Sequence, residues 1–133
     1  MKQEEKELLL KDLCGRLPYG VKCKIHTHVH GDTVYKLTDI RDNGYTCGTV
    51  KDKYAWAVLD ISEVKPYLFP LSSMAEEQKE FLRRQSWCIA ISTSGTIETI
   101  IEGFDWLNKN HFDYRGLIEK SLAIDATNLG IYK

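Results

Sequence analysis

The chain has 133 residues, of which 43% are hydrophobic and 28% charged, and its 18 basic and 19 acidic residues give a net charge of −1. This length and composition are ordinary for one globular domain, so we expect a single domain over residues 1–133 and exclude disordered and fibrous classes. Nucleic-acid binding needs clustered positive charge, and the longest basic run here is Arg83 with Arg84, so that class is disfavoured.

The N-terminus carries no targeting signal that we recognise. It reads MKQEEKELLLKD, with only Leu8 to Leu10 apolar in a row, whereas a secretory signal needs roughly 7 to 15 apolar residues and a membrane helix about 20. The cysteines form no CxxC pair, which excludes zinc ribbons and thioredoxin motifs: Cys14, Cys23, Cys47 and Cys88. We therefore expect a cytoplasmic protein with reduced thiols and no membrane partner.

Residues 3–16 are predicted to form a helix, because apolar side chains recur at i, i+3, i+4 and i+7: Leu10, Leu13, Cys14 and Leu17. A half-buried strand follows over 21–27, where apolar and polar residues alternate. Gly31 and Asp32 predict a tight turn before a second strand at 33–41, either face of which could be buried.

Asn43 and Gly44 give the strongest hairpin signal in the chain, since both tolerate the positive φ angles of a type I′ turn. They lead to strands at 45–50 and 54–59. Consecutive strands linked by hairpins predict an antiparallel meander over about residues 20–62.

In the second half of the chain the pattern of apolar and polar residues is less regular. Residues 64–74 are predicted to be a connector, because Pro66 and Pro70 lack the N–H groups that a sheet requires. Ser73 and Glu76 match a capping box and predict that a helix begins there. The apolar run 87–93 predicts a buried strand, whereas 97–109 fits helical spacing better than its strand-like composition. The predicted fold class is α+β: the meander packed against N-terminal and C-terminal helices.

Three stretches resemble a family of small uncharacterised proteins encoded by gut bacteria and by their prophages and mobile elements. They read LLLKDLCGRLPYGVK (8–22), VKPYLFPLSSMAEEQKE (64–80) and DWLNKNHFDYRGLIEKSLAIDA (105–126). Ser121 stands where the resemblance implies glycine, and Glu119 where it implies proline. The resemblance implies a phage or mobile-element setting, but no activity, ligand or catalytic residue.

HTHVH, residues 26–30, places His26, His28 and His30 at alternate positions of a strand or its end. Such side chains lie roughly 7 Å apart on one face, so two could share a metal ion with a third ligand from elsewhere. Gly20 to His28 also resembles the opening of the cupin pattern, but the second cupin motif is missing. We favour a solvated strand face and expect no cofactor; a metal-binding domain or metal-dependent enzyme is the alternative.

Two further stretches combine side chains that could bind a partner or an anion: KPYLFP (65–70) and NHFDYRG (110–116). The candidate binding residues are Tyr67, Phe69, His111, Asp113, Tyr114 and Arg115. A structural interpretation competes, in which Asp113 caps backbone N–H groups and Arg115 pairs with an acid. We favour that interpretation for the loop, and an ordered crossover for the proline-flanked aromatics.

No catalytic residue is assigned. Cys88 lies among apolar residues, and it could act as a nucleophile only if the fold brought a base such as His111 to it. The chain has no P-loop, GxSxG or HExxH motif. We therefore expect a non-enzymatic protein that binds a protein partner, and the sequence leaves its oligomeric state open. A nucleic-acid module would use basic residues that acidic neighbours offset: Lys22, Lys24, Lys36 and Arg41.

Overall fold

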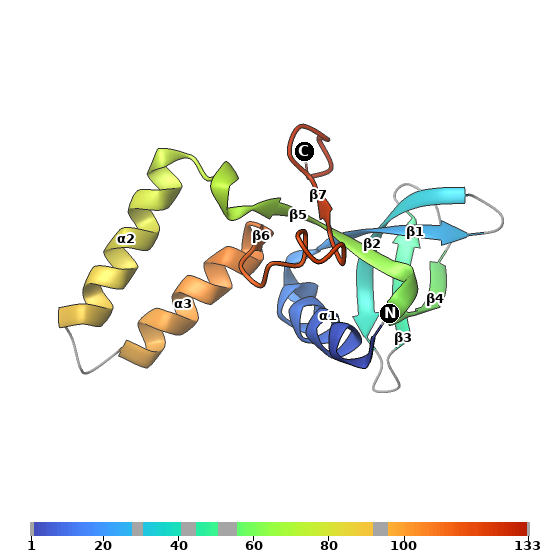
Figure 1. The fold of residues 1–133 in the computed structure, drawn as a ribbon, viewed down its shortest axis with the longest axis horizontal. Helices are drawn as coiled ribbons and strands as arrows, with labels where there is room; N and C mark the ends of the chain where they lie inside the picture. Colours follow the sequence, from blue (N-terminus) through green and yellow to red (C-terminus); the bar gives the residue numbers. More distant parts are fainter. Residues whose placement is uncertain (1, 28–30, 41–44, 51–55, 92–95, 133) are drawn as a thin grey trace.

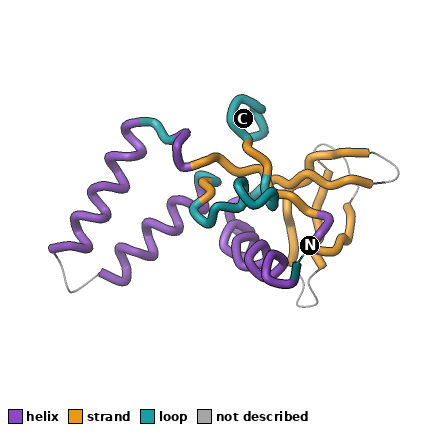
Figure 2. Tube along the Cα trace, viewed as in Figure 1, coloured by secondary structure: helices purple, strands orange, loops and turns teal. Residues whose placement is uncertain are grey.

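A computed structural model describes residues 2–27, 31–40, 45–50, 56–91 and 96–132 of the chain, with side chains described outside 25–33, 41–60 and 85–97. The sheet and the first helix lie together on one side of the molecule, and a hairpin of two helices extends from the other side (Figures 1 and 2). The fold is α+β, as predicted.

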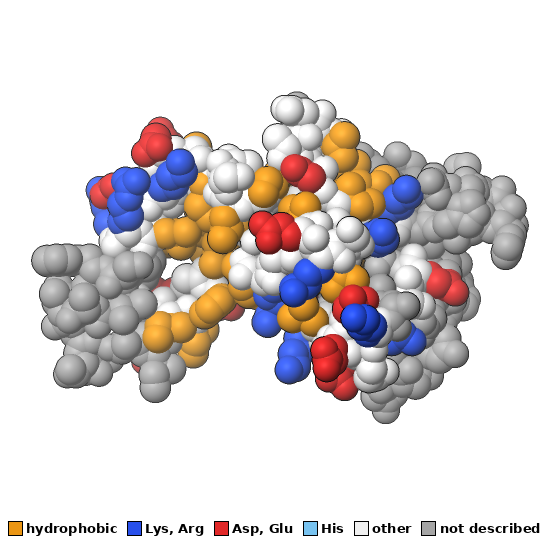
Figure 3. Space-filling view, in the orientation of Figure 1, with side chains coloured by type: hydrophobic (Ala, Val, Ile, Leu, Met, Phe, Trp, Pro, Cys, Tyr) orange, Lys and Arg blue, Asp and Glu red, His pale blue; other side chains and the backbone are white. Residues whose placement is uncertain are grey.

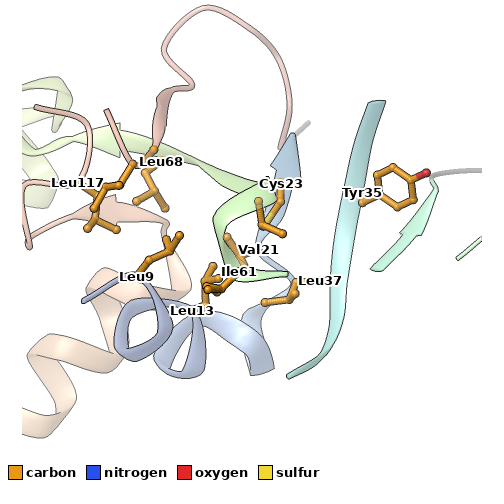
Figure 4. Packing of buried hydrophobic residues seen from close by; sticks show 12 residues of the cluster. Leu9, Leu13, Val21, Cys23, Tyr35, Leu37, Ile61, Leu68 and Leu117 are labelled. Carbon is orange, nitrogen blue, oxygen red and sulfur yellow. The ribbon is translucent and has the colours of Figure 1, made fainter. Parts of the chain in front are cut away.

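Helix α1 spans Gln3–Arg16, the predicted range. Its start is capped by Glu5, whose carboxylate accepts the backbone N–H of Lys2 at 3.3 Å. Leu9 and Leu13 are fully buried, and they face the sheet together (Figure 4). After a 3-10 turn (η1, Leu17–Tyr19), Gly20 reverses the chain with φ +68°, a left-handed conformation that glycine adopts at little cost.

The predicted meander is confirmed. Strands β1 (Lys22–Thr27), β2 (Gly31–Ile40), β3 (Tyr45–Val50) and β4 (Trp56–Asp60) pair antiparallel in the order β4-β3-β2-β1. The predicted turn at Gly31 is wrong: Gly31 pairs with Thr27 and already belongs to β2, so the connection is 28–30. On β2, Tyr35 and Leu37 are buried, which identifies the face that the sequence left open. The predicted Asn43 and Gly44 turn lies outside the described residues.

The predicted connector is a strand. β5 (Val64–Pro70) pairs antiparallel with β1 over residues 64–66, where Pro66 lies opposite Cys23. It then pairs in parallel with two short strands, β6 (Phe112–Asp113) and β7 (Ile124–Asp125). Each pairing is only two or three residues long, so β5 never needs the continuous row of N–H donors that two prolines would interrupt. The sheet is therefore mixed rather than purely antiparallel.

The helices of the second half differ from the prediction at two points. Ser73 lies in a 3-10 turn (η3, Leu71–Ser73) and its hydroxyl donates to the carbonyl of Pro70 at 2.7 Å, so it does not cap the helix. The carboxamide of Gln78 instead accepts the N–H of Ala75 at 2.9 Å, and α2 runs from Glu76 to Ile91.

The strand predicted at 87–93 is also wrong, because 87–91 form the last turns of α2. A short apolar run has the same appearance in a buried strand and in a helix. Helix α3 (Thr96–Lys109) is confirmed.

One cluster of buried side chains holds α1 against the sheet (Figure 4). Its members are Leu9, Leu13, Val21, Cys23, Tyr35, Leu37, Ile61, Val64, Leu68, Leu117, Leu122 and Ala123. Ile61 lies in a 3-10 turn (η2, Ile61–Glu63) between β4 and β5. The hairpin of α2 and α3 meets this body at its base, where α3 contacts α1 and β6.

Candidate functional site

The six candidate binding residues lie together at the base of the helical hairpin. Tyr67 and Phe69 belong to β5, and the other four belong to residues 111–115, which lead out of α3 through β6. Pairing of Phe69 with Phe112 brings the two stretches side by side. The backbone N–H of Phe69 also donates to the carbonyl of His111 at 2.8 Å.

A continuous row of rings joins the hairpin to the sheet. Neighbouring ring centroids are 5.0 to 6.2 Å apart over most of the row, within the usual range for aromatic pairs, and 3.8 Å apart at its last pair. We call these rings the aromatic row: Phe81, Trp106, Phe112, Phe69, Tyr132 and His111. Because the row starts on α2, crosses α3 and includes Tyr132 of the C-terminal segment, it fixes the direction of the hairpin.

His111 has a left-handed backbone, with φ +61°, directly after the last turn of α3. Its N–H donates to the carbonyl of Asn108 at 3.1 Å, which closes the helix end. The ring is buried and stacks on Tyr132. Burial, followed by the positive charges of Arg16 and Lys22, lowers the pKa of His111 from 6.5 to about 4, so the ring is neutral at neutral pH.

Tyr132 takes the place of a hydrogen bond between strands. Cys23 lies opposite Pro66, so Lys22 and Tyr67 are the next facing pair of β1 and β5. Their backbone groups are bridged by the Tyr132 hydroxyl, which accepts the N–H of Lys22 at 2.9 Å and donates to the carbonyl of Tyr67 at 2.7 Å. The Lys22 ammonium donates to the carbonyl of Ile131 at 2.7 Å. The C-terminal segment is thereby tied to the sheet.

A buried ion cluster lies under the loop. The guanidinium of Arg16 donates to both carboxylate oxygens of Asp12, at 2.7 and 3.1 Å, and to the carbonyl of Phe112 at 2.6 Å. Both side chains are fully buried. Nε of Arg115 lies 3.5 Å from the same carboxylate. We call these three residues, Asp12, Arg16 and Arg115, the ion cluster.

Two candidate residues support this cluster and the loop. The Tyr114 ring centroid lies 5.2 Å from the guanidinium carbons of Arg16 and of Arg115, and its hydroxyl donates to Asn108 at 2.9 Å. Asp113 accepts the backbone N–H groups of Leu117 and Ile118 at 2.9 Å each. These contacts agree with the capping interpretation for Asp113 and Tyr114, whose oxygens bond to the protein's own groups. In the same loop, Nδ1 of His111 and Nε of Arg115 are buried without a hydrogen-bond partner among the described residues.

A hollow of about 250 Å³ lies beside the aromatic row, between the start of α2 and the loop. Its polar side chains already bond to nearby backbone: Ser73 to Pro70, Gln78 to Ala75 and Asn110 to Trp106. Phe69 and Phe112 complete the lining. The hollow is small, and its polar groups do not converge on its interior as those of a ligand site do.

The catalytic and metal hypotheses gain nothing from the geometry. Cys88 lies near the end of α2, at the tip of the hairpin, whereas His111 follows the end of α3 at its base, so the fold does not bring them together. The backbone of His26 pairs with Asp32, and the side chains of the HTHVH stretch lie outside the description. Across the described part of the chain, no three His, Cys, Asp or Glu side chains could hold a metal ion.

Sequence reasoning missed an exposed apolar surface on α3. Ile100, Ile101 and Phe104 are 39%, 52% and 47% exposed, and hydrophobic side chains are visible over this helix in Figure 3. We call these three residues the α3 face. Their helical spacing was recognised, but such a stripe usually faces the core. Trp106 could have indicated this exposure. It lies two positions beyond Phe104 and therefore on another side of the helix, so both large side chains cannot face the same neighbour.

In comparisons with known proteins, no family model matches the chain, and no match is found among curated proteins or among solved structures.

Proposed function

We propose that the protein acts by binding a protein partner through the α3 face, rather than by catalysis. The observation that carries the proposal is the exposure of Ile100, Ile101 and Phe104 on one side of a helix whose opposite side, with Trp106, packs on Phe81 of α2. Side chains of this size stabilise a fold only when they are buried, and contiguous exposed apolar groups commonly mark an interaction site.

The described neighbours of α3 leave about half of this face uncovered. Helix α2 packs on the side of α3 that carries Trp106, which stacks on Phe81. Phe104 precedes Trp106 by two residues, which is a rotation of about 200° around the helix axis, so the two side chains point in nearly opposite directions. Helix α1 reaches only the end of α3, where a Cβ placed on Gly15 would lie 3.2 Å from the Asn108 side chain. The α3 face is left between these two contacts.

The base of the hairpin holds this surface in place. The Phe104 ring contacts the edge of Tyr114, with centroids 5.1 Å apart, and Tyr114 is fixed by Asn108 and the ion cluster. The aromatic row fixes α3 against β5 and β6. A rigid surface loses little conformational entropy on association, which favours binding. The candidate residues of the base thus position the binding surface rather than contact the partner.

The setting is part of the same proposal. The resemblance of residues 8–22, 64–80 and 105–126 to proteins of prophages and mobile elements supports a partner that belongs to a bacterial host. No described helix has the length and apolar character needed to cross a bilayer. Cys14 and Cys23 are free, and burial, with a smaller contribution from Asp12, raises the pKa of the Cys23 thiol well above its usual range. Both are compatible with a cytoplasmic protein whose thiols stay reduced.

Site-specific photo-cross-linking tests the proposal. p-Benzoylphenylalanine would replace Ile101 on the α3 face or, as a control, Glu119, which is also exposed but lies in the turn that follows Leu117. In cells that carry the native gene, we expect a discrete protein adduct from position 101 only. It should disappear when Ile100 and Phe104 are both replaced by serine. Equal adducts at both positions, or none at 101, would contradict the proposal.

A further inference from the structure

The α3 face has an acidic border on one side. Glu98, Glu102 and Asp105 are spaced i, i+4 and i+7 and are all exposed. This spacing places them on one stripe of the helix, next to Ile101, which is three residues from Glu98 and four from Asp105. We call Glu98, Glu102 and Asp105 the acidic stripe.

Several exposed charges of helix α2, by contrast, are paired within the helix. There Glu76 lies 3.5 Å from Lys79, and Glu80 lies 3.2 Å from Arg83 and 3.8 Å from Arg84. Acid and base alternate at i+3 and i+4, which mildly stabilises a helix. In the part of the chain that the structure describes, no basic side chain is paired with any member of the acidic stripe.

The stability of α3 does not explain the stripe. Like charges three and four residues apart repel one another along a helix. Asp105 also lies in the second half of α3, nearer the negative end of the helix dipole. Glu98, in the first turn, is favourably placed. Asp105 has Lys109 four residues later, a spacing that only mildly stabilises a helix, and among the described residues the two side chains form no ion pair. An unpaired acidic stripe beside an exposed apolar face is the arrangement expected when the missing positive charges belong to another molecule.

We propose that the partner docks on α3 as an amphipathic helix whose apolar side chains are bordered by lysine or arginine. The apolar side chains of that helix would cover Ile100, Ile101 and Phe104, and its basic residues would face Glu98, Glu102 and Asp105. This inference rests on the proposed function and specifies its partner. Helix-on-helix recognition suits a single exposed helical face with anchors at i, i+1 and i+4.

Two other occupants fit the charges less well. Anionic lipid surfaces attract amphipathic helices rich in lysine and arginine, whereas the polar border of α3 is acidic. Antiparallel pairing of α3 with α3 of a second copy would place two acidic stripes against each other, which like-charge repulsion disfavours.

The experiment repeats the cross-linking at position 101 in two charge backgrounds. One variant carries Glu98→Gln, Glu102→Gln and Asp105→Asn. The matched control carries Glu4→Gln, Glu63→Gln and Glu119→Gln, three exposed acids outside the hairpin, so the net charge changes equally. Exposed substitutions of this kind leave stability nearly unchanged, which circular dichroism checks. The adduct is mapped by mass spectrometry of its tryptic peptides.

We expect the adduct yield to fall by about tenfold in the stripe variant and to stay unchanged in the control, since three partly solvated ion pairs together support roughly that change in affinity. Salt at about 0.5 M should produce a similar fall in the unmodified protein. The mapped peptide should carry lysine or arginine beside apolar residues at helical spacing.

Four results would overturn the inference: an unchanged yield in the stripe variant, an adduct on an acidic or uncharged segment, an adduct on a second copy of this chain, and an adduct on lipid. In the first two cases a protein still binds the α3 face and the proposed function survives. If no adduct forms at position 101 even in the unmodified background, the proposed function fails as well.

Discussion

The base of the helical hairpin and the α3 face use their residues in opposite ways. The base buries Asp12 and Arg16 completely, although buried ion pairs seldom add stability over apolar residues of the same volume. The α3 face exposes two isoleucines and a phenylalanine, each of which would contribute roughly 1.5–3 kcal/mol if it were fully buried. The difference indicates that the base is built for a defined geometry, and it supports the proposal that the α3 face receives another molecule.

The largest expected effect comes from breaking the ion cluster. Asp12→Ala leaves the buried guanidinium of Arg16 without its carboxylate, and we expect the free energy of unfolding to fall by about 3–5 kcal/mol. Urea denaturation monitored by tryptophan fluorescence would measure it. The exposed pair of Glu76 and Lys79 is the control, since Glu76→Ala should cost less than about 1 kcal/mol. Equal losses in the two variants would remove the distinction between base and surface.

Tyr132→Phe tests the bridge between β1 and β5 while keeping the ring in the aromatic row. It leaves the N–H of Lys22 and the carbonyl of Tyr67 without their shared partner, so we expect a loss of about 1–3 kcal/mol. Hydrogen exchange of the Lys22 amide should accelerate. Tyr114→Phe removes a hydroxyl that donates to the side chain of Asn108, and it should cost less. A Lys22 amide that stays equally protected would show that the hydroxyl does not support this edge.

His111 makes the stability of the base depend on pH. Its pKa is about 4 in the folded chain, against 6.5 as its ordinary value. Between these values the unfolded chain binds a proton that the folded chain does not, so stability is complete above pH 6.5 and declines as the pH falls toward 4. His111→Asn, which also tolerates a left-handed backbone, should flatten this part of the profile. Denaturation midpoints measured across the window check it, and an unchanged slope in the variant would assign the dependence to other groups.

The sequence predicted those parts of this comparison that depend on local pattern. The helices 3–16 and 97–109, the meander and the capping role of Asp113 all follow from spacing within a few residues. The sequence does not predict strand β5, because proline is a poor strand former on average. In the structure β5 changes pairing partners along its length, so its prolines interrupt no long ladder. That change is a property of the fold, since β6 and β7 come from residues more than forty positions later.

The candidate site shows the same limit. The sequence marks the aromatic and charged residues of the base as a dense group, but Asp12, Arg16 and Tyr132, which contact them in the fold, lie far away in sequence. The helical spacing of residues 97–109 predicts the helix, but an apolar stripe of this kind does not show whether it faces the core or solvent. The exposure of the α3 face follows from the packing of Trp106 on Phe81 and Phe112, and no periodicity within α3 specifies those contacts.

The backbone conformation of Ser121, in the C-terminal segment, provides a further test of stability outside the α3 face. Its φ of +61° lies in the left-handed region, where a residue other than glycine or asparagine is strained. Ser121→Gly should therefore raise the free energy of unfolding by about 0.5–1 kcal/mol, after the greater freedom of glycine in the unfolded chain is counted. Asn128, with φ +65°, is the matched control, because asparagine tolerates this conformation and Asn128→Gly should gain less. Equal gains, or a loss at 121, would mean that backbone strain there is not what limits stability.

The smallest expected effect belongs to the α3 face. Ile101 is 52% exposed, so Ile101→Gln gives up little burial and glutamine is a good helix former; the change in stability should stay within about 0.5 kcal/mol. The same substitution at Leu13, which is fully buried in the core, should cost several kcal/mol by placing an unsatisfied carboxamide among apolar side chains. Thermal and urea denaturation of the two variants give this contrast directly. A loss at Ile101 approaching that at Leu13 would mean that the helix buries this side chain within the chain itself, and the face would then have no surface to offer a partner.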